Sequence, residues 1–297
     1  MKDSSFPTSS RQGFTLVEVL VSSFLTLMVM GMLFTVLIGT IDAWEGGTSK
    51  LEAGGNTRAA LDLLKSDLEG LVARQTQYNQ EWLYSGPSHI DSDGDFQEVA
   101  STSSRPTNTM MAFFSPSLDR APNQQGDIVA LSYSVWYQDP ISPDSNITPI
   151  FGLYKGMTTT EEAFNDVLGS PLLPKPGTPG FWWTSSANPL MYDSSGFLAP
   201  HVVHFTVTWL VRYPGQSNLT RLDESHIVRL SNILEVTGPN GDDGGKIEAA
   251  EISITTISEE GMDRFRFFEG TANQAGQLPQ IIDEFGTTHT IRVPITY

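Results

Sequence analysis

The feature that most constrains this chain is an apolar run from Phe14 to about Ile41 that contains a single charged residue, Glu18. About 28 residues at roughly 1.5 Å each give a helix of about 42 Å, which exceeds the bilayer core of about 30 Å. The run therefore predicts a membrane-spanning helix. A carboxylate near the end of such a span costs about 2.5–3.5 kcal/mol, so we expect a partner to compensate Glu18.

Two ordinary explanations of the run are weaker. A secretory signal peptide has an apolar region of about 7–15 residues, roughly half the length seen here. A plain signal anchor accounts for the length, but it does not account for the sequence Gly-Phe-Thr-Leu-Val-Glu at residues 13–18.

That hexapeptide follows a short polar leader, and together they resemble the class III signal of type IV pilins and type II secretion pseudopilins. The resemblance implies that prepilin peptidase cuts after Gly13 and that the new N-terminal Phe14 is methylated. It also assigns Glu18 to filament assembly. The implied partners are prepilin peptidase, other pilin or pseudopilin subunits and an inner-membrane assembly platform.

Elementary electrostatics gives this motif a rationale. Cleavage would leave an amine on Phe14 that is largely protonated at neutral pH. In a stack of staggered helices, that amine can meet the Glu18 carboxylate of a neighbouring subunit. Such a buried pair is weak evidence for stability, but it can specify register.

The charge distribution orients the chain. The net charge is −17, whereas the leader contains Lys2 and Arg11. By the positive-inside rule we expect the leader in the cytoplasm and the acidic head outside, so that the chain is a single-pass inner-membrane protein in contact with lipid, with a periplasmic head. Nucleic acid is not an expected partner, because phosphate binding needs clustered Lys and Arg.

The chain is predicted to have four parts: a leader (1–13), a membrane helix that forms the filament core (14–41), a continuation of that helix (42–75) and a β-rich head (76–297). Leu61, Leu64, Leu68 and Leu71 form an apolar stripe on the continuation. The glycine pairs at 46–47 and 54–55 predict a hinge or break. The arrangement resembles that of pseudopilins, in which a long helix packs on such a head. Residues 56–68 resemble the J-type minor pseudopilins and their relatives in Verrucomicrobia and Planctomycetes, in which an Arg- and Ala-rich helix follows the anchor.

The head shows strand patterns. Alternation of apolar residues predicts strands at 127–138, 201–213, 248–257 and 289–295, and one further short strand is expected at 110–114. The rest of 85–126 is expected to be loops, and 140–200 a Pro- and Gly-rich insertion with a small helix at 160–168. Residues 221–236 fit helix or strand. We predict an α+β fold: a long N-terminal helix, with its first half transmembrane, packed on a mostly antiparallel, pilin-like β-sheet head.

Cofactor sites have little support in the sequence. Asp91, Asp93 and Asp95 alternate as calcium ligands do, but an EF-hand loop would need glycine at its sixth position. A second loop pairs Asp242 with Glu251 but has glycine at a ligand position. Acidic turns explain both segments, so calcium is a weak candidate and no other cofactor is expected.

No hydrolase elbow, phosphate loop or zinc-protease motif occurs, and the chain has no cysteine. We therefore predict a non-enzymatic subunit, a minor pseudopilin of a type II secretion-type filament. The alternatives are a minor type IV pilin for adhesion, motility or DNA uptake, or a membrane-anchored binding domain or enzyme.

Overall fold

A computed structural model describes ten segments of the chain: residues 15–75, 82–90, 96–98, 108–117, 127–141, 148–163, 196–230, 233–236, 244–268 and 274–297. The chain divides into two compact units after Thr48. The first unit contains the N-terminal part of helix α1 (Leu16–Glu69), and the second contains the rest of α1 and the whole head.

Helix α1 is continuous through both glycine pairs, so the predicted break is wrong. Glycine costs about 1 kcal/mol in a helix interior, yet it can adopt helical angles, and propagation from the turns on either side carries the helix through. The helix ends at Glu69, before the predicted limit of residue 75. The chain leaves the helix there because the N–H of Val72 donates to the carbonyl of Phe114, 2.8 Å away.

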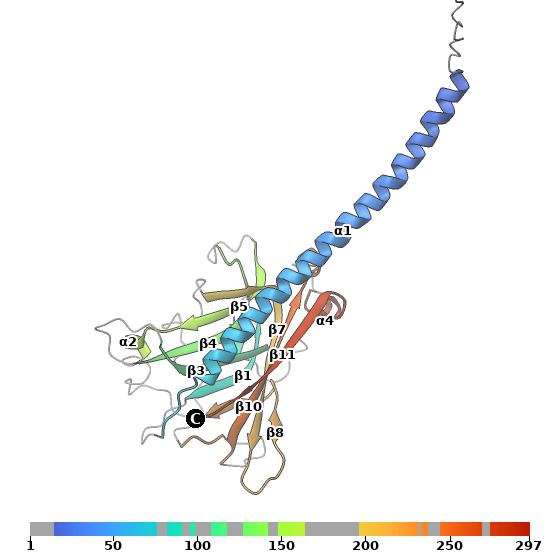
Figure 1. Cartoon of the computed structure of the whole chain (residues 1–297). Helices are drawn as coiled ribbons and strands as arrows, with labels where there is room; N and C mark the ends of the chain where they lie inside the picture. The colour runs from blue at the N-terminus through green and yellow to red at the C-terminus, as the bar shows by residue number, and fades with distance from the viewer. Residues whose placement is uncertain are drawn as a thin grey trace, which may run out of the picture. The chain divides into compact units, whose positions relative to one another are not determined.

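The head contains a seven-stranded antiparallel sheet of order β2-β1-β3-β4-β5-β6, with β9 also paired to β1 (Figure 1). Its strands are β1 (Leu83–Ile90), β2 (Phe96–Glu98), β3 (Asn108–Pro116), β4 (Ile128–Gln138), β5 (Ile150–Met157), β6 (Phe197–Pro200) and β9 (Val228–Leu230).

A second, four-stranded antiparallel sheet has the order β11-β10-β7-β8. It consists of β7 (Val202–Arg212), β8 (Thr220–Leu222), β10 (Lys246–Ile257) and β11 (Gly286–Pro294), and the short helices are α2 (Thr160–Glu162), α3 (Glu259–Phe267) and α4 (Gln274–Phe285).

One apolar core contains residues from α1 and from both sheets. The four leucines of the predicted stripe are all buried, and they share this core with Phe113 of β3 and Phe205 of β7. This confirms the α+β class, with the second part of the long helix packed on antiparallel strands.

The predicted loop region 85–126 is partly wrong, because β1 and β2 lie in it and β3 is longer than predicted. Strand β1 contains Pro87, and proline cannot donate a hydrogen bond to a ladder. In β1 it pairs with Thr109 on one side only, and on the other side it lies between the segments that pair with β9 and β2. Its missing N–H therefore costs no hydrogen bond.

The prediction of an insertion over 140–200 also needs correction. Strand β5 pairs with β4 along its full length and with β6 on its other side, so residues 150–157 belong to the main sheet. Helix α2 begins at the predicted residue, with Thr159 in a capping box, and residues 164–168 lie outside the described residues. Among the described residues of 221–236, the ordered elements are the strands β8 and β9 rather than a helix, and helices α3 and α4 were not predicted from the sequence.

Candidate assembly site in the N-terminal helix

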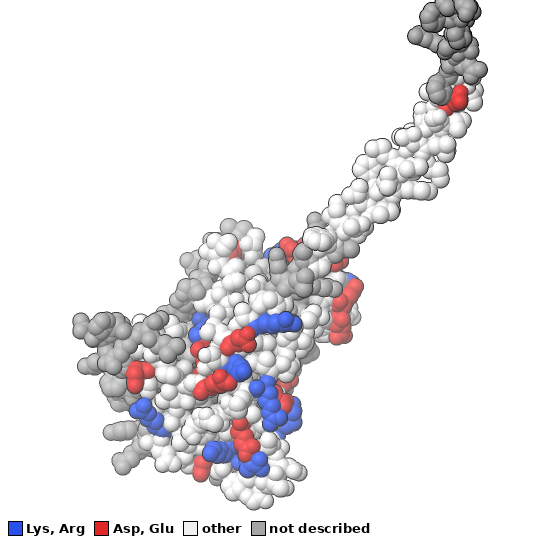
Figure 2. Space-filling model, viewed as in Figure 1, with Lys and Arg blue, Asp and Glu red and all other residues white. Residues whose placement is uncertain are grey.

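The first part of α1 is long and apolar enough to cross a membrane. Residues Leu16–Ile41 have a mean hydropathy of 2.3, and none of their side chains is buried within the chain. In Figure 2 this part of the helix is white except for an acidic group near its start. Apolar side chains that find no core within their own chain need lipid or another protein.

Glu18 lies in the first turn of α1 and is exposed. Its backbone N–H donates to Oγ1 of Thr15 at 3.3 Å, the bond that an N-cap residue makes, while its carboxylate forms no ion pair with any residue that the structure describes. Gly13 and Phe14 lie outside the described residues. The predicted roles of all three residues therefore stay predictions.

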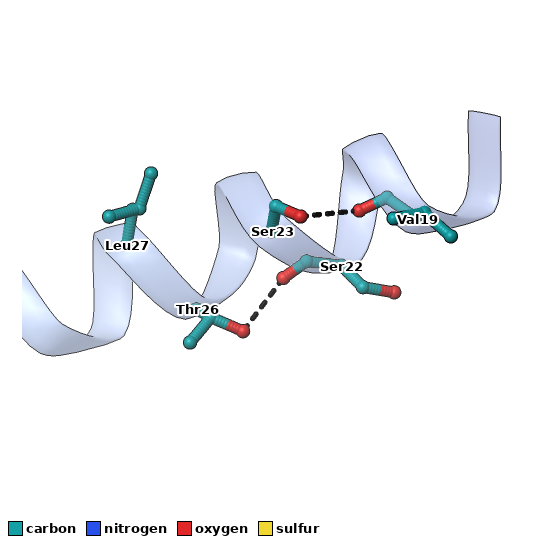
Figure 3. Close-up of a pocket in the computed structure, with 5 residues that line it drawn as sticks. All are labelled: Val19, Ser22, Ser23, Thr26 and Leu27. Carbon is teal, nitrogen blue, oxygen red and sulfur yellow. Dashed lines mark hydrogen bonds between the residues drawn. The ribbon is translucent and has the colours of Figure 1, made fainter. Parts of the chain in front are cut away.

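The polar side chains beyond Glu18 are satisfied within the helix. Ser22, Ser23 and Thr26 each donate a hydroxyl to the carbonyl four residues earlier, at 2.7–2.8 Å. Figure 3 shows these hydroxyls between Val19 and Leu27. Because the hydroxyl hydrogens are bonded to the helix's own carbonyls, these residues can face lipid or a second helix without an unpaired donor.

Two glycines in the same segment make no close contact with the described part of the chain. A Cβ atom added at Gly31 or Gly39 would meet nothing within 4 Å. Thr35 lies midway between them and donates to the carbonyl of Gly31 at 3.0 Å. Small residues at four-residue spacing lie on one side of a helix, where they allow another backbone to approach closely.

The calcium candidates lie mostly outside the described residues, which include neither Asp91, Asp93 and Asp95 nor Asp242. Glu251 is on β10, where its carboxylate lies 2.6 Å from Arg221 and 3.9 Å from Arg292. The described part of the chain contains no group of three or more His, Cys, Asp or Glu residues that could hold a metal ion.

A polar cluster that the sequence reasoning missed fixes the end of α1 to the larger sheet. Asp67 accepts hydrogen bonds from the hydroxyl of Tyr133 on β4 and from the Nζ atom of Lys155 on β5. Burial, followed by the negative charge of Asp67, raises the pKa of Tyr133 far above its usual value. The sequence did contain a sign of this cluster. Asp67 lies three residues after Leu64 and four before Leu71, which places a carboxylate on the buried stripe.

The N-terminal segment matches a known family model. Residues 8–34 match the prokaryotic N-terminal methylation motif, which covers the predicted cleavage site and Glu18. The match supports the predicted prepilin-type signal at the N-terminus. The motif and the apolar helix that follows it together support a membrane-anchored chain.

Comparisons of the whole chain add little to this motif. No curated protein gives a significant match. Among solved structures, a type IV-like pilin from Thermus thermophilus is similar at 12% identity and a TM-score of 0.36, over 82% of this chain and 96% of that one. A likeness of that strength does not show that the two heads share a fold.

Proposed function

We propose that this type IV pilin-like protein is a minor pseudopilin-like subunit of a type II secretion-type envelope filament. The observation that carries the proposal is the methylation motif at the start of an apolar helix whose side chains are all exposed. Prepilin peptidase cuts after Gly13, and the chain then joins the filament from the inner membrane through its assembly platform. The head stays in the periplasm.

In this proposal, assembly depends on the amine of Phe14, the carboxylate of Glu18 and two glycines of the apolar helix. The amine of Phe14 pairs with the Glu18 carboxylate of a neighbour, and the pair fixes the stagger between helices. Gly31 and Gly39 let a neighbouring helix approach closely, which accounts for two glycines that nothing else in the described chain requires. The head, with its own core, meets other subunits or cargo.

The same motif occurs in type IV pilins, so a minor pilin for adhesion, motility or DNA uptake is the competing function. The two differ in their neighbours. A cross-linking experiment on the full-length chain in native membranes identifies them, and the absence of native cysteine makes it specific. A single cysteine at Thr35, midway between the two glycines, is cross-linked and its products are identified by mass spectrometry.

We expect cross-links to pseudopilins of a secretion system, and an N-terminus that starts at Phe14. Cross-links to pilus subunits would assign the chain to the competing function. An intact Met1 with no cross-link to any protein that carries a prepilin signal would exclude both. A cysteine at Asp62, on the exposed side of the head's part of α1, is the control for nonspecific collision.

A further inference from the structure

The four-stranded sheet ends on one side in a long outermost strand. Strand β11 has nine residues, whereas the other outermost strands among those described have three (β2, β8 and β9) or four (β6). Short outer strands protect a sheet against pairing with other chains, because they offer few free backbone groups. Strand β11 lacks this protection.

The hydrogen-bond pattern shows which backbone groups of β11 are free. The N–H of Ile295 donates to the carbonyl of Glu248, and at the other end the N–H of Ser258 donates to that of Phe285. With the β10–β11 register, these bonds assign the odd-numbered residues 287–295 to the ladder with β10. The N–H and C=O groups of Thr288, Thr290 and Arg292 therefore point away from the sheet.

These three donors and three acceptors have no partner within the described chain. A second long edge shows that free groups are covered elsewhere. On β7, the N–H of Phe205 donates to the Asn108 side chain at 2.8 Å, and the N–H of Val207 donates to Thr109 at 3.1 Å. The fold caps the β7 edge with side chains and leaves β11 without such caps.

The side chains of β11 also suit an added strand. Thr288 and Thr290 are exposed, and their hydroxyls lie 2.8 and 2.9 Å from hydroxyls on β10. No lysine lies in the strand, and its proline is at the end. Arg292 lies 3.9 Å from the Glu251 carboxylate, which is closer to Arg221 at 2.6 Å, so this contact is weak and the Arg292 guanidinium can also pair with an incoming carboxylate.

The position of β11 indicates where an occupant would come from. A Cβ atom at Gly54 of α1 would lie 3.8 Å from Nε2 of His289, the residue between Thr288 and Thr290. Figure 1 shows β11 running alongside this part of α1. The free edge thus lies beside the second part of α1, where a subunit packed along this part of the helix would reach it.

We propose that the free edge of β11 pairs with an extended strand of a neighbouring filament subunit, with an acidic side chain of that strand placed opposite Arg292. This inference rests on the proposed function, because the occupant is another subunit of the filament. Main-chain hydrogen bonds from residues 288, 290 and 292 supply the contact, and Arg292 selects the register.

Cysteine labelling of the full-length chain tests the proposal. A single cysteine at Thr290 should react with a soluble maleimide at least tenfold more slowly in native membranes than after solubilisation in detergent. The matched control is a cysteine at Thr206 on β7, which pairs with Ser253 on the same face of the sheet but lies two strands from β11, at the edge that side chains cap. Its rate should change less than twofold.

Thr290→Pro tests the backbone directly. Proline removes the outward N–H but no bond of the β10–β11 ladder, so the head should keep its thermal stability. A cysteine at Thr288 in this variant should lose its protection in membranes.

The outcomes separate this inference from the proposed function. Equal labelling of the Thr290 cysteine in membranes and in detergent, while the Thr35 cysteine still cross-links to other subunits, overturns strand pairing and leaves the proposed function standing. Failure of the Thr35 cross-links as well overturns both.

Discussion

The Nζ atom of Lys155 lies 2.5 Å from Oδ2 of Asp67, so that an ion pair joins β5 to α1. The two side chains are only 16% and 18% exposed, and the Tyr133 hydroxyl donates to the same carboxylate oxygen. Removing one member of a buried pair leaves the other charge uncompensated, which costs more than the pair contributes.

Asp67→Asn should therefore lower the free energy of unfolding of the head by about 2–4 kcal/mol, a value at the low end for buried pairs because some solvent reaches this one. Urea unfolding of the full-length chain in detergent measures the change. Asp62→Asn, on the exposed side of the same helix, is the control and should stay within about 0.5 kcal/mol of wild type. Equal stability of both variants would exclude a structural role for the cluster.

Tyr133 should make stability depend on alkaline pH. Its pKa in the folded chain is raised by burial and then by Asp67, above the value of about 10 in the unfolded chain. The folded state then holds a proton that the unfolded state releases, so this contribution is complete below pH 10 and is lost as pH rises above it. One such group changes the unfolding free energy by about 1.4 kcal/mol per pH unit.

Tyr133→Phe should remove that slope while other tyrosines titrate as before. Unfolding free energies of wild type and variant, measured from pH 8 to pH 11, should differ by a constant amount below pH 10 and converge above it. Parallel curves across the whole range would show that Tyr133 ionises as easily in the folded chain as in the unfolded one.

Processing depends on a residue without a side chain at position 13. Gly13→Ala should slow cleavage by prepilin peptidase, and a bulkier residue should block it. The fraction of chains that start at Phe14, measured by mass spectrometry of protein from native membranes, reports the effect. Thr15→Ser, which keeps the N-cap hydroxyl, serves as the control and should be cleaved normally. Normal maturation of the bulky variant would contradict the predicted site.

Glu18→Ala should leave membrane insertion intact, because it removes the only charge between Thr15 and Ile41. Cross-linking of the processed chain from the Thr35 cysteine to its neighbours should fall at least tenfold. Glu18→Asp keeps the charge with a shorter reach and separates geometry from charge. Undiminished cross-linking in Glu18→Ala, once the chain is cleaved, would remove the assembly role.

Sequence patterns predicted the parts of this fold that repeat with a regular period. The leucines from Leu61 to Leu71 and the alternating residues of β4, β7 and β10 locate the core, because one face of each element must be buried. β1 was missed because its serines, Gly86 and Pro87 are typical of loops, and only pairing with strands distant in sequence makes it regular. Tertiary contacts of this kind leave no local signal.

The residues of the candidate site also differ in whether the sequence alone could predict them. Glu18 was identifiable from sequence because a charge in a membrane helix is conspicuous against its neighbours. The position of Asp67 on the leucine stripe indicated a partly buried carboxylate. Its partner Lys155 could not be identified from the sequence, because the two residues are 88 positions apart in the chain. The uncovered edge of β11 was also beyond sequence reasoning, since an outermost strand and an inner strand show the same alternation.

The seating of α1 in the head determines how the head responds to force. A pull along the second part of α1 acts parallel to the leucine stripe, which lies in a core shared with both sheets. All four leucines and the Asp67 cluster then resist sliding together, whereas a force across the helix would open the same contacts one at a time. The contacts between this helix and the head therefore resist shear better than peeling, which suits the proposed function, in which a subunit is pushed or withdrawn along its axis.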